Sequence, residues 1–193
     1  MNLMRAFIAV EIPAPIQHAI QQATAALRGE VGPLVRWAPP DNIHLTLKFL
    51  GDISAPSVEA LTQILRAEAD AHPALDIRIG GLGSFPSLRR VRVIYIGIQA
   101  PAGLEALHRG IESACARLGY ESDNARGFSP HLTIGRVRQD VSASDRQIIH
   151  RALEKTTIDS LGVARVDSVQ VYKSELNPSG AVYTRLFSAP LKN

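Results

Sequence analysis

The sequence has only one cysteine, Cys115, in 193 residues, so no disulfide can form within the chain. Cys115 stands at helical spacing from Leu107, Ile111 and Leu118, which predicts a small buried residue rather than a nucleophile. No apolar run approaches the roughly 20 residues needed to cross a bilayer. The apolar run near the N-terminus is broken at Glu11 and lacks the cleavage site of a signal peptide. We therefore expect a cytoplasmic protein that does not bind membranes.

Neither sign of charge dominates strongly. The net charge is +3 and the sequence pI about 9.3, which is compatible with a polyanionic partner but is weak evidence alone. Apolar residues make up 46% and charged residues 20%, a balance typical of soluble globular proteins. The length fits one domain or two small lobes that share a core. No heptad pattern is visible, so we expect a monomer.

The sequence resembles itself at a fixed distance. Residues 8–13 match residues 96–101, and the motif at 44–47 matches the motif at 131–134, with offsets of 88 and 87 residues. Two independent matches at nearly the same offset predict a duplicated unit of strand, helix and motif. We place the two copies at about 5–70 and 92–157, as intertwined lobes of a single domain spanning 1–193. The alternative is a generic α+β domain whose two halves are similar by chance.

Apolar periodicity predicts the elements around this repeat. Helical patterns start at Ile16 and Leu104, and glycines mark their ends at Gly29 and Gly119. Ser54 opens one further helix, and Ser142 or Ser144 opens another. Strands are expected as two pairs, at 75–85 with 91–98 and at 163–173 with 181–188, the second pair joined across residues 177–180.

These elements predict an α+β fold. We expect two pseudo-symmetric lobes of antiparallel sheet, with helices on their outer faces and a cleft between them.

Two His-x-Thr motifs occupy corresponding points of the repeat. With six His and seven Thr in the chain, chance predicts on the order of 0.2 such motifs. Strand alternation sends the aliphatic residues after each His and Thr into the core. It sends His44, Thr46, His131 and Thr133 to the other face. If the lobes are related by a twofold axis, both imidazoles enter the cleft.

Each histidine has a plainer interpretation, because a lone histidine on a strand is usually structural. His18, His72, His108 and His150 have no matching partner, and we expect them at the surface. A metal site is the second alternative. However, neither motif has a carboxylate or second His at ligand spacing, and nothing acidic follows the second motif before Asp140. We therefore expect neither a metal nor another cofactor.

Two imidazoles and two hydroxyls suit phosphate chemistry. Near neutral pH a histidine exists in both protonation states, so one can accept a proton while the other donates one. Threonine hydroxyls can donate hydrogen bonds to phosphate oxygens as charge builds in the transition state. A strained cyclic phosphodiester fits this machinery, since its leaving oxygen needs only one proton. The near-identity of the motifs leaves open which histidine is the acid.

The chain resembles the two-histidine phosphoesterase superfamily, and within it the RNA 2′,3′-cyclic phosphodiesterases, also named 2′-5′ RNA ligases. The resemblance runs nearly end to end. Beside the paired motifs, it is carried by residues 5–10, 36–51, 128–137 and 174–183. Gly135 stands where the family usually has alanine, and we expect no loss of chemistry from it.

The resemblance implies a bilobal α+β enzyme that hydrolyses RNA 2′,3′-cyclic phosphates to 2′-phosphates and can join RNA 2′-5′ in reverse without ATP. RNA ends, tRNA halves among them, are the implied partners. It implies His44 as proton donor and His131 as proton acceptor. It also implies phosphate binding by Thr46, Thr133 and Arg136.

Strict alternation puts Arg136 on the face opposite His131, so its role needs a bulge at Gly135; otherwise it is a solvent-facing side chain. Further candidates for substrate contact, with packing as the alternative for the aromatic ones, are Phe7, Trp37, Arg92, Phe128 and Tyr183. Two other functions stay open. One is a phosphodiesterase of small nucleotide cyclic phosphates or 2′-5′ oligoadenylates. The other is a module that binds RNA ends without turnover.

Overall fold

The computed structural model describes residues 3–121, 127–177 and 180–192. Pro178 and Ser179, in the expected turn between the last two strands, lie outside the described residues. The strands are β1 (Leu3–Glu11), β2 (Val35–Trp37), β3 (His44–Ser54), β4 (Leu75–Phe85), β5 (Val93–Gln99), β6 (His131–Val137), β7 (Ser160–Val166), β8 (Ser168–Asn177) and β9 (Gly180–Pro190). The helices are α1 (Ala14–Ala23), α2 (Ala25–Val31), α3 (Ala55–Ala71), α4 (Ala102–Ala116) and α5 (Ala143–Lys155), with short 3-10 turns η1 (Gly32–Leu34), η2 (Pro40–Asn42) and η3 (Leu88–Arg90).

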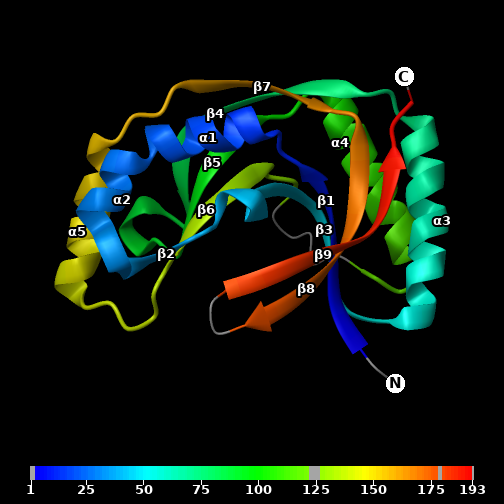
Figure 1. Ribbon diagram of the computed structural model, residues 1–193, viewed down its shortest axis with the longest axis horizontal. Coiled ribbons are helices and arrows are strands. Elements are labelled where there is room, and N and C mark those ends of the chain that lie inside the picture. The colour runs from blue at the N-terminus through cyan, green and yellow to red at the C-terminus, as the bar shows by residue number, and fades with distance from the viewer. Residues whose placement is uncertain (1–2, 122–126, 178–179, 193) are drawn as a thin grey trace.

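The strands form one antiparallel sheet in the order β7-β4-β5-β6-β3-β1-β8-β9, with β2 added beside β6. The two motif strands, β3 and β6, meet at its centre through a single pair, Leu45 with Leu132. This contact divides the sheet into one half of β7-β4-β5-β6 with β2 added and one half of β3-β1-β8-β9. Helices α3 and α4 contact the β3-β1-β8-β9 half, and α1 contacts β7 in the other half, where α2 and α5 pack together (Figure 1). The predicted α+β fold of antiparallel sheet and helices is confirmed.

The chain crosses between these halves, and here one prediction was wrong. Residues 163–173 were expected to form one strand. Instead the chain turns at Asp167, so that β7 pairs with β4 in one half and β8 pairs with β1 in the other. Both segments have the β-branched composition of strands, and the sequence does not mark the change of partner. Strand β9 then pairs with β8, as a hairpin.

The helix ends follow the sequence signals in part. The single helix expected from Ile16 to Gly29 is divided at Thr24 into α1 and α2, and Gly29 ends neither: α2 ends at Val31 and is followed by Gly32, which has a φ of 46°. In the second copy, α4 ends at Ala116 and Gly119 follows with a φ of 86°. This left-handed conformation favours glycine, as predicted from the sequence. Ser142 caps α5 through a reciprocal pair of hydrogen bonds with Asp145.

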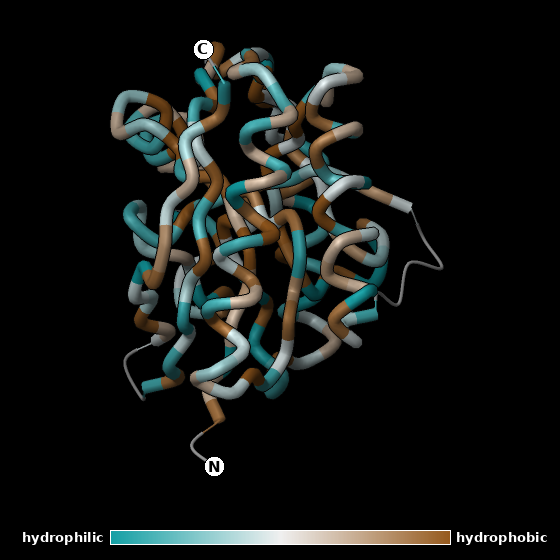
Figure 2. The backbone as a smooth tube through the Cα atoms, turned by 90° about the vertical axis from the view of Figure 1, so that its right-hand side faces the viewer, coloured by the Kyte–Doolittle hydropathy of each residue, from teal (hydrophilic) through white to brown (hydrophobic). Residues whose placement is uncertain are grey.

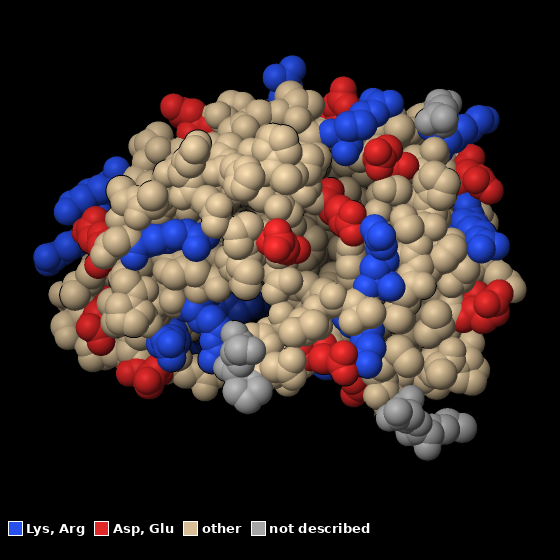
Figure 3. Space-filling model, in the orientation of Figure 1, with Lys and Arg blue, Asp and Glu red and all other residues tan. Residues whose placement is uncertain are grey.

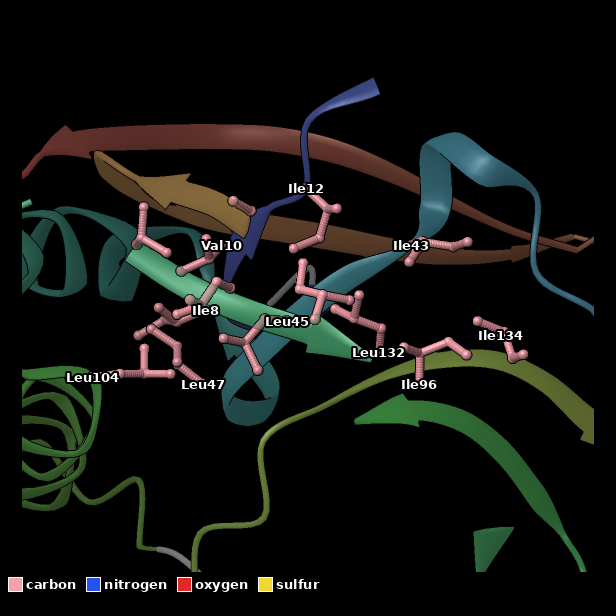
Figure 4. Packing of buried hydrophobic residues seen from close by; sticks show 14 of the residues in the cluster. Ile8, Val10, Ile12, Ile43, Leu45, Leu47, Ile96, Leu104, Leu132 and Ile134 are labelled. Carbon is pink, nitrogen blue, oxygen red and sulfur yellow. The ribbon is translucent and has the colours of Figure 1, made fainter. Parts of the chain in front are cut away.

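One continuous hydrophobic core lies between the helices and the sheet. Hydrophobic segments run along the inner strands and recur at intervals on the helices (Figure 2). Ile8, Leu45, Ile96 and Leu132 are all fully buried, and they gather where the two halves of the sheet meet (Figure 4). Cys115 is buried as predicted, and burial raises the pKa of its thiol to about 11. The core thus fixes both motif strands from behind.

Candidate active site

The two motif histidines begin the two central strands. His44 is the first residue of β3 and His131 the first residue of β6, and both are partly exposed. Leu45 and Leu132, the next residues, are fully buried and face each other in antiparallel register. In such a pair the flanking residues lie on the opposite face, with His44 beside Thr133 and Thr46 beside His131. The strand pair therefore presents both motifs on one face.

Both imidazoles are held in the same way. The Nδ1 atom of His44 lies 2.8 Å from the carbonyl oxygen of Asn42, and Nδ1 of His131 lies 2.7 Å from that of Ser129. A carbonyl oxygen only accepts hydrogen bonds, so Nδ1 must carry the hydrogen in both rings. This leaves Nε2 of each histidine as the atom that can accept or donate a proton. The arrangement orients two acid–base groups with one tautomer each.

Arg136 reaches the same face because of a bulge. Thr133 pairs with Tyr95 and Gly135 with Ile94, so Ile134 is an extra residue in β6 without a partner in β5. Arg136 then pairs with Val93, on the face of Tyr95 and Thr133. The bulge expected near Gly135 is therefore present. Within the described residues, Arg136 forms no ion pair with a carboxylate, which leaves it available for an anion.

Aromatic rings support each histidine. Phe7 stacks on His44 with ring centroids 4.8 Å apart, and Tyr172 stacks on the other face of Phe7 at 5.4 Å. His131 likewise contacts Tyr95 at 5.3 Å and Phe85 at 4.9 Å, and those two rings stack at 4.4 Å.

Three of these rings were missed in the sequence, although the repeat marks them. Tyr95 lies 88 residues after Phe7, and Tyr172 lies 87 residues after Phe85. These are the two offsets of the duplicated unit. Extending the repeat from the motifs to the neighbouring strands would have identified both aromatic pairs.

Burial sets the protonation of His44. Removal from water lowers the pKa of His44 below its ordinary 6.5, and its hydrogen bond to the Asn42 carbonyl offsets this in part. The positive charges of Arg136 and of protonated His131 lower the pKa of His44 further. The same Arg136 charge acts on Tyr183, whose pKa is raised by burial. His44, His131, Arg136 and Tyr183 therefore share one electrostatic environment.

The other predicted contact residues divide into two groups. Tyr183 stands edge-on to His44 at 5.2 Å and is partly exposed, so it belongs to the site. Phe7 is also there, but His44 and Tyr172 cover its two faces and leave none for a base. Arg92 is exposed just before β5, and its backbone carbonyl accepts from Val137.

Two aromatic candidates pack elsewhere. Trp37 lies under the guanidinium of Arg28, which is 4.6 Å from the ring centroid. Phe128 stacks on His108, with centroids 3.8 Å apart. The expectation that His108 lies at the surface was wrong: it is 7% exposed, because α4 turns it inward against Phe128. The His108 ring therefore contacts Phe128 instead of solvent.

The described residues contain no group of three or more His, Cys, Asp or Glu arranged to hold a metal ion. No helix in residues 3–121, 127–177 and 180–192 has both the length and the apolar character needed to cross a bilayer.

The sequence and the structure are similar to proteins already characterised. The profile of the 2′-5′ RNA ligase superfamily matches residues 12–178. A protein of Methanothermobacter thermautotrophicus named RNA 2′,3′-cyclic phosphodiesterase is 28% identical over 94% of this chain and 95% of its own length. The Escherichia coli protein of the same name is 36% identical over 67% of this chain and 70% of its own.

Solved structures have the same fold. The crystal structure of E. coli LigT with 3′-AMP superposes with a TM-score of 0.76 at 28% identity, covering all of both chains. A Thermus thermophilus protein, 24% identical, superposes with a TM-score of 0.82 over 98% of this chain and 99% of its own; at that identity it is informative about the fold alone.

Proposed function

Because this chain belongs to the 2′-5′ RNA ligase superfamily, we propose that it opens 2′,3′-cyclic phosphates at RNA ends and leaves a 2′-phosphate. Relatives from archaea and bacteria are named RNA 2′,3′-cyclic phosphodiesterase. The observation that carries the proposal is the matched pair of imidazoles. Each is fixed at Nδ1 by the carbonyl two residues earlier, and each begins one of the two central strands.

The proposed reaction moves one proton at each histidine. Nε2 of His131 accepts a proton from water as the water oxygen bonds to phosphorus. The bond between phosphorus and O3′ breaks, and protonated His44 donates its Nε2 proton to O3′. The phosphate stays on O2′, and exchange with solvent restores both histidines. The assignment of His44 as acid and His131 as base follows the family pattern.

The remaining polar groups stabilise the charge that builds on the phosphate. The hydroxyls of Thr46 and Thr133 have no hydrogen bond within the described residues, so both can donate to non-bridging oxygens. Arg136 supplies a full positive charge on the same face. A charge-assisted hydrogen bond contributes about 1.5–3 kcal/mol where the other group is held in place.

The test is turnover of an RNA oligonucleotide that ends in a 2′,3′-cyclic phosphate, with the position of the product phosphate read by mass spectrometry and digestion. His44→Ala and His131→Ala should each lower kcat by roughly 10²–10⁴-fold, the usual contribution of one acid–base group. His150→Ala, on the outer helix α5, is the matched control and should keep full activity. Unchanged turnover in either motif variant would exclude the mechanism.

The same geometry supports 2′-5′ ligation, in which an RNA hydroxyl takes the place of water. If the 5′-hydroxyl of a second RNA replaces water, its O5′ bonds to phosphorus as O3′ leaves, and a 2′-5′ linkage forms without ATP. Ligation should then need both histidines, since the proton transfers are the same. A mixture of cyclic-phosphate RNA and 5′-hydroxyl RNA, with and without each variant, tests this. Ligation that persists in His131→Ala would contradict it.

A further inference from the structure

We propose that the pocket beside His44 binds the base of the terminal nucleoside and selects bases that carry an exocyclic amino group over uracil. The inference rests on the proposed cyclic-phosphate chemistry and adds a specificity that this chemistry does not require. The shape of the pocket, its position relative to the two histidines and its charge all favour such a base.

The pocket has a volume of about 280 Å³, near the lower end of the roughly 300–1,000 Å³ range of small-molecule sites. This is suited to one nucleoside rather than to several. His44, Tyr172 and Tyr183 contribute aromatic surface, and Ile12 and Ile43 contribute aliphatic surface. Flat aromatic walls suit a base, because every base has a π-face. Polar groups are supplied by Glu11, Gln17, Asp41 and Asn42.

The position of the pocket fits the nucleoside that leaves. The pocket borders His44, while His131 is not among its lining residues. In a 2′,3′-cyclic phosphate the leaving O3′ belongs to the ribose that carries the terminal base. The group that donates a proton to O3′ must therefore stand on the side of that nucleoside. A pocket at His44 alone is where the terminal base belongs if His44 is the acid.

The charge of the pocket differs from that of the corresponding place in the other half. By the offsets of the repeat, Glu11 corresponds to Gln99 and Asp41 to Phe128, so the second copy has no carboxylate at either position. Conversely, Arg136 corresponds to Phe49, which is 71% exposed.

The corresponding positions of the two halves therefore differ in charge, with a cation beside the second motif and carboxylates at the pocket beside the first. The face in Figure 3 has acidic side chains beside its central hollow, with basic side chains to the right of the hollow and a further basic group below and to the left.

Glu11 is held in place as a hydrogen-bond acceptor. Tyr172 donates its hydroxyl proton to Oε1 of Glu11, and Arg185 lies 3.2 Å from the same atom. Oε2 has no hydrogen bond or ion pair within the described residues, so it can accept one from a ligand. An amino group, such as N4 of cytosine, donates to it. Uracil presents the O4 carbonyl at that place and would be repelled by the carboxylate.

Cytosine and uracil are the best pair for the test, because they have the same size and differ in the group that would face Glu11, an amino group in cytosine and a carbonyl oxygen in uracil. We would measure kcat/KM for two dinucleotides, adenosine followed by cytidine or by uridine 2′,3′-cyclic phosphate. The expected preference for cytidine is about tenfold, the value of one hydrogen bond to a charged group. Glu11→Gln, which can also donate, should bring the ratio close to one. Glu59→Gln on α3, an exposed carboxylate outside the pocket, should leave the ratio unchanged.

The variant Tyr172→Phe tests whether recognition of the base requires the carboxylate of Glu11 itself or its hydrogen bond to Tyr172. It removes the hydroxyl bonded to Glu11 and keeps the carboxylate and the ring, so the preference for cytidine should persist. If Glu11→Gln does not fold, Asp41→Asn gives the same comparison, with a reduced ratio expected. A wild-type ratio near one, or a ratio unchanged in Glu11→Gln, overturns the base pocket while cyclic-phosphate opening stands. Absence of turnover on both dinucleotides overturns the proposed function itself.

Discussion

At the scale of single residues, each catalytic histidine candidate is oriented by one hydrogen bond at Nδ1, which leaves Nε2 as the atom that can exchange a proton. The carbonyls of Asn42 and Ser129 occupy Nδ1 of the two histidines, and the stacked rings behind them restrict their rotation. His44 is distinguished from His131 by its surroundings rather than by its motif. Burial, Arg136 and His131 all lower the pKa of His44.

This electrostatic setting predicts a bell-shaped dependence of kcat/KM on pH. The pair must hold one proton, because below both pKa values no base remains and above both no acid remains. Since the pKa of His44 lies below 6.5 in the free protein, the acid limb of kcat/KM should also lie below pH 6.5. A bound phosphate anion raises the pKa of His44, so the acid limb of kcat should lie at higher pH. An acid limb of kcat/KM at or above pH 6.5 would contradict the lowered pKa of His44.

Arg136 gives a second prediction at this scale. Arg136→Gln removes the charge that faces the phosphate, and kcat/KM should fall by roughly 10–100-fold. It should also raise the pKa of His44 and move the acid limb of kcat/KM upward, because one cause of the lowered pKa is gone. Arg138→Gln is the control. It removes the same charge from the same strand end, where Arg138 donates to the carbonyl of Pro33, and neither effect should appear.

At the scale of elements, the bulge in β6 decides where side chains point. The extra residue at Ile134 turns Arg136 to the cleft and Gly135 to the core face, against β2. The equivalent irregularity in β3, at Leu47, turns Lys48 inward, where its ammonium lies 2.6 Å from Glu112 of α4. The same irregularity at corresponding points of the two strands therefore places Arg136 on the face of the motifs and Lys48 in the packing between sheet and helix.

The close packing of Gly135 against β2 gives a prediction about stability. A Cβ at Gly135 would lie 2.7 Å from Cγ1 of Val35 and 2.9 Å from Cε3 of Trp37, closer than side-chain atoms normally approach. Gly135→Ala should therefore lower the free energy of unfolding by about 1–3 kcal/mol, the usual cost of overpacking. Urea denaturation followed by the fluorescence of Trp37 measures it.

Because Gly135 faces the core, kcat should stay within about twofold of the wild type, in contrast to the motif variants. Gly29→Ala is the matched control. Its Cβ meets nothing within 4 Å in helix α2, so stability should rise by about 0.5–1 kcal/mol. A stabilised Gly135→Ala would show that Val35 and Trp37 move aside at no cost.

At the scale of the molecule, the two halves of the sheet cannot separate without losing strands. Strand β8 follows β7 directly in the chain but pairs with β1 in the other half. Strand β4 follows β3 and α3 in the chain but pairs with β5 and β7 in the half that contains β6. A single buried cluster runs through both halves. The two halves therefore form one structural unit rather than two domains in contact.

This topology predicts a single unfolding transition. Trp37 is the only tryptophan and reports on the half that contains β6, whereas far-UV circular dichroism reports on both halves. The two signals should give coincident urea transitions, which is the standard test of two-state unfolding. Separate midpoints would mean that the halves unfold independently. His150→Ala offers a control, because a substitution on the outer helix should leave the coincidence intact.

Sequence alone determined the α+β class, the paired motifs and their common strand face. Strand alternation depends only on neighbouring residues, and the repeat can be read directly from the sequence. It also indicated the bulge, through the position of Arg136. Only the tertiary structure decided the change of partner at Asp167, the inward position of His108 and the packing of Trp37 and Phe128.

These features depend on contacts between segments far apart in the chain, which composition and periodicity do not reveal. The pocket beside His44 belongs with them. It is assembled from β1, α1, η2, β3, β8 and β9, and its acidic groups come together only when the sheet brings those segments together.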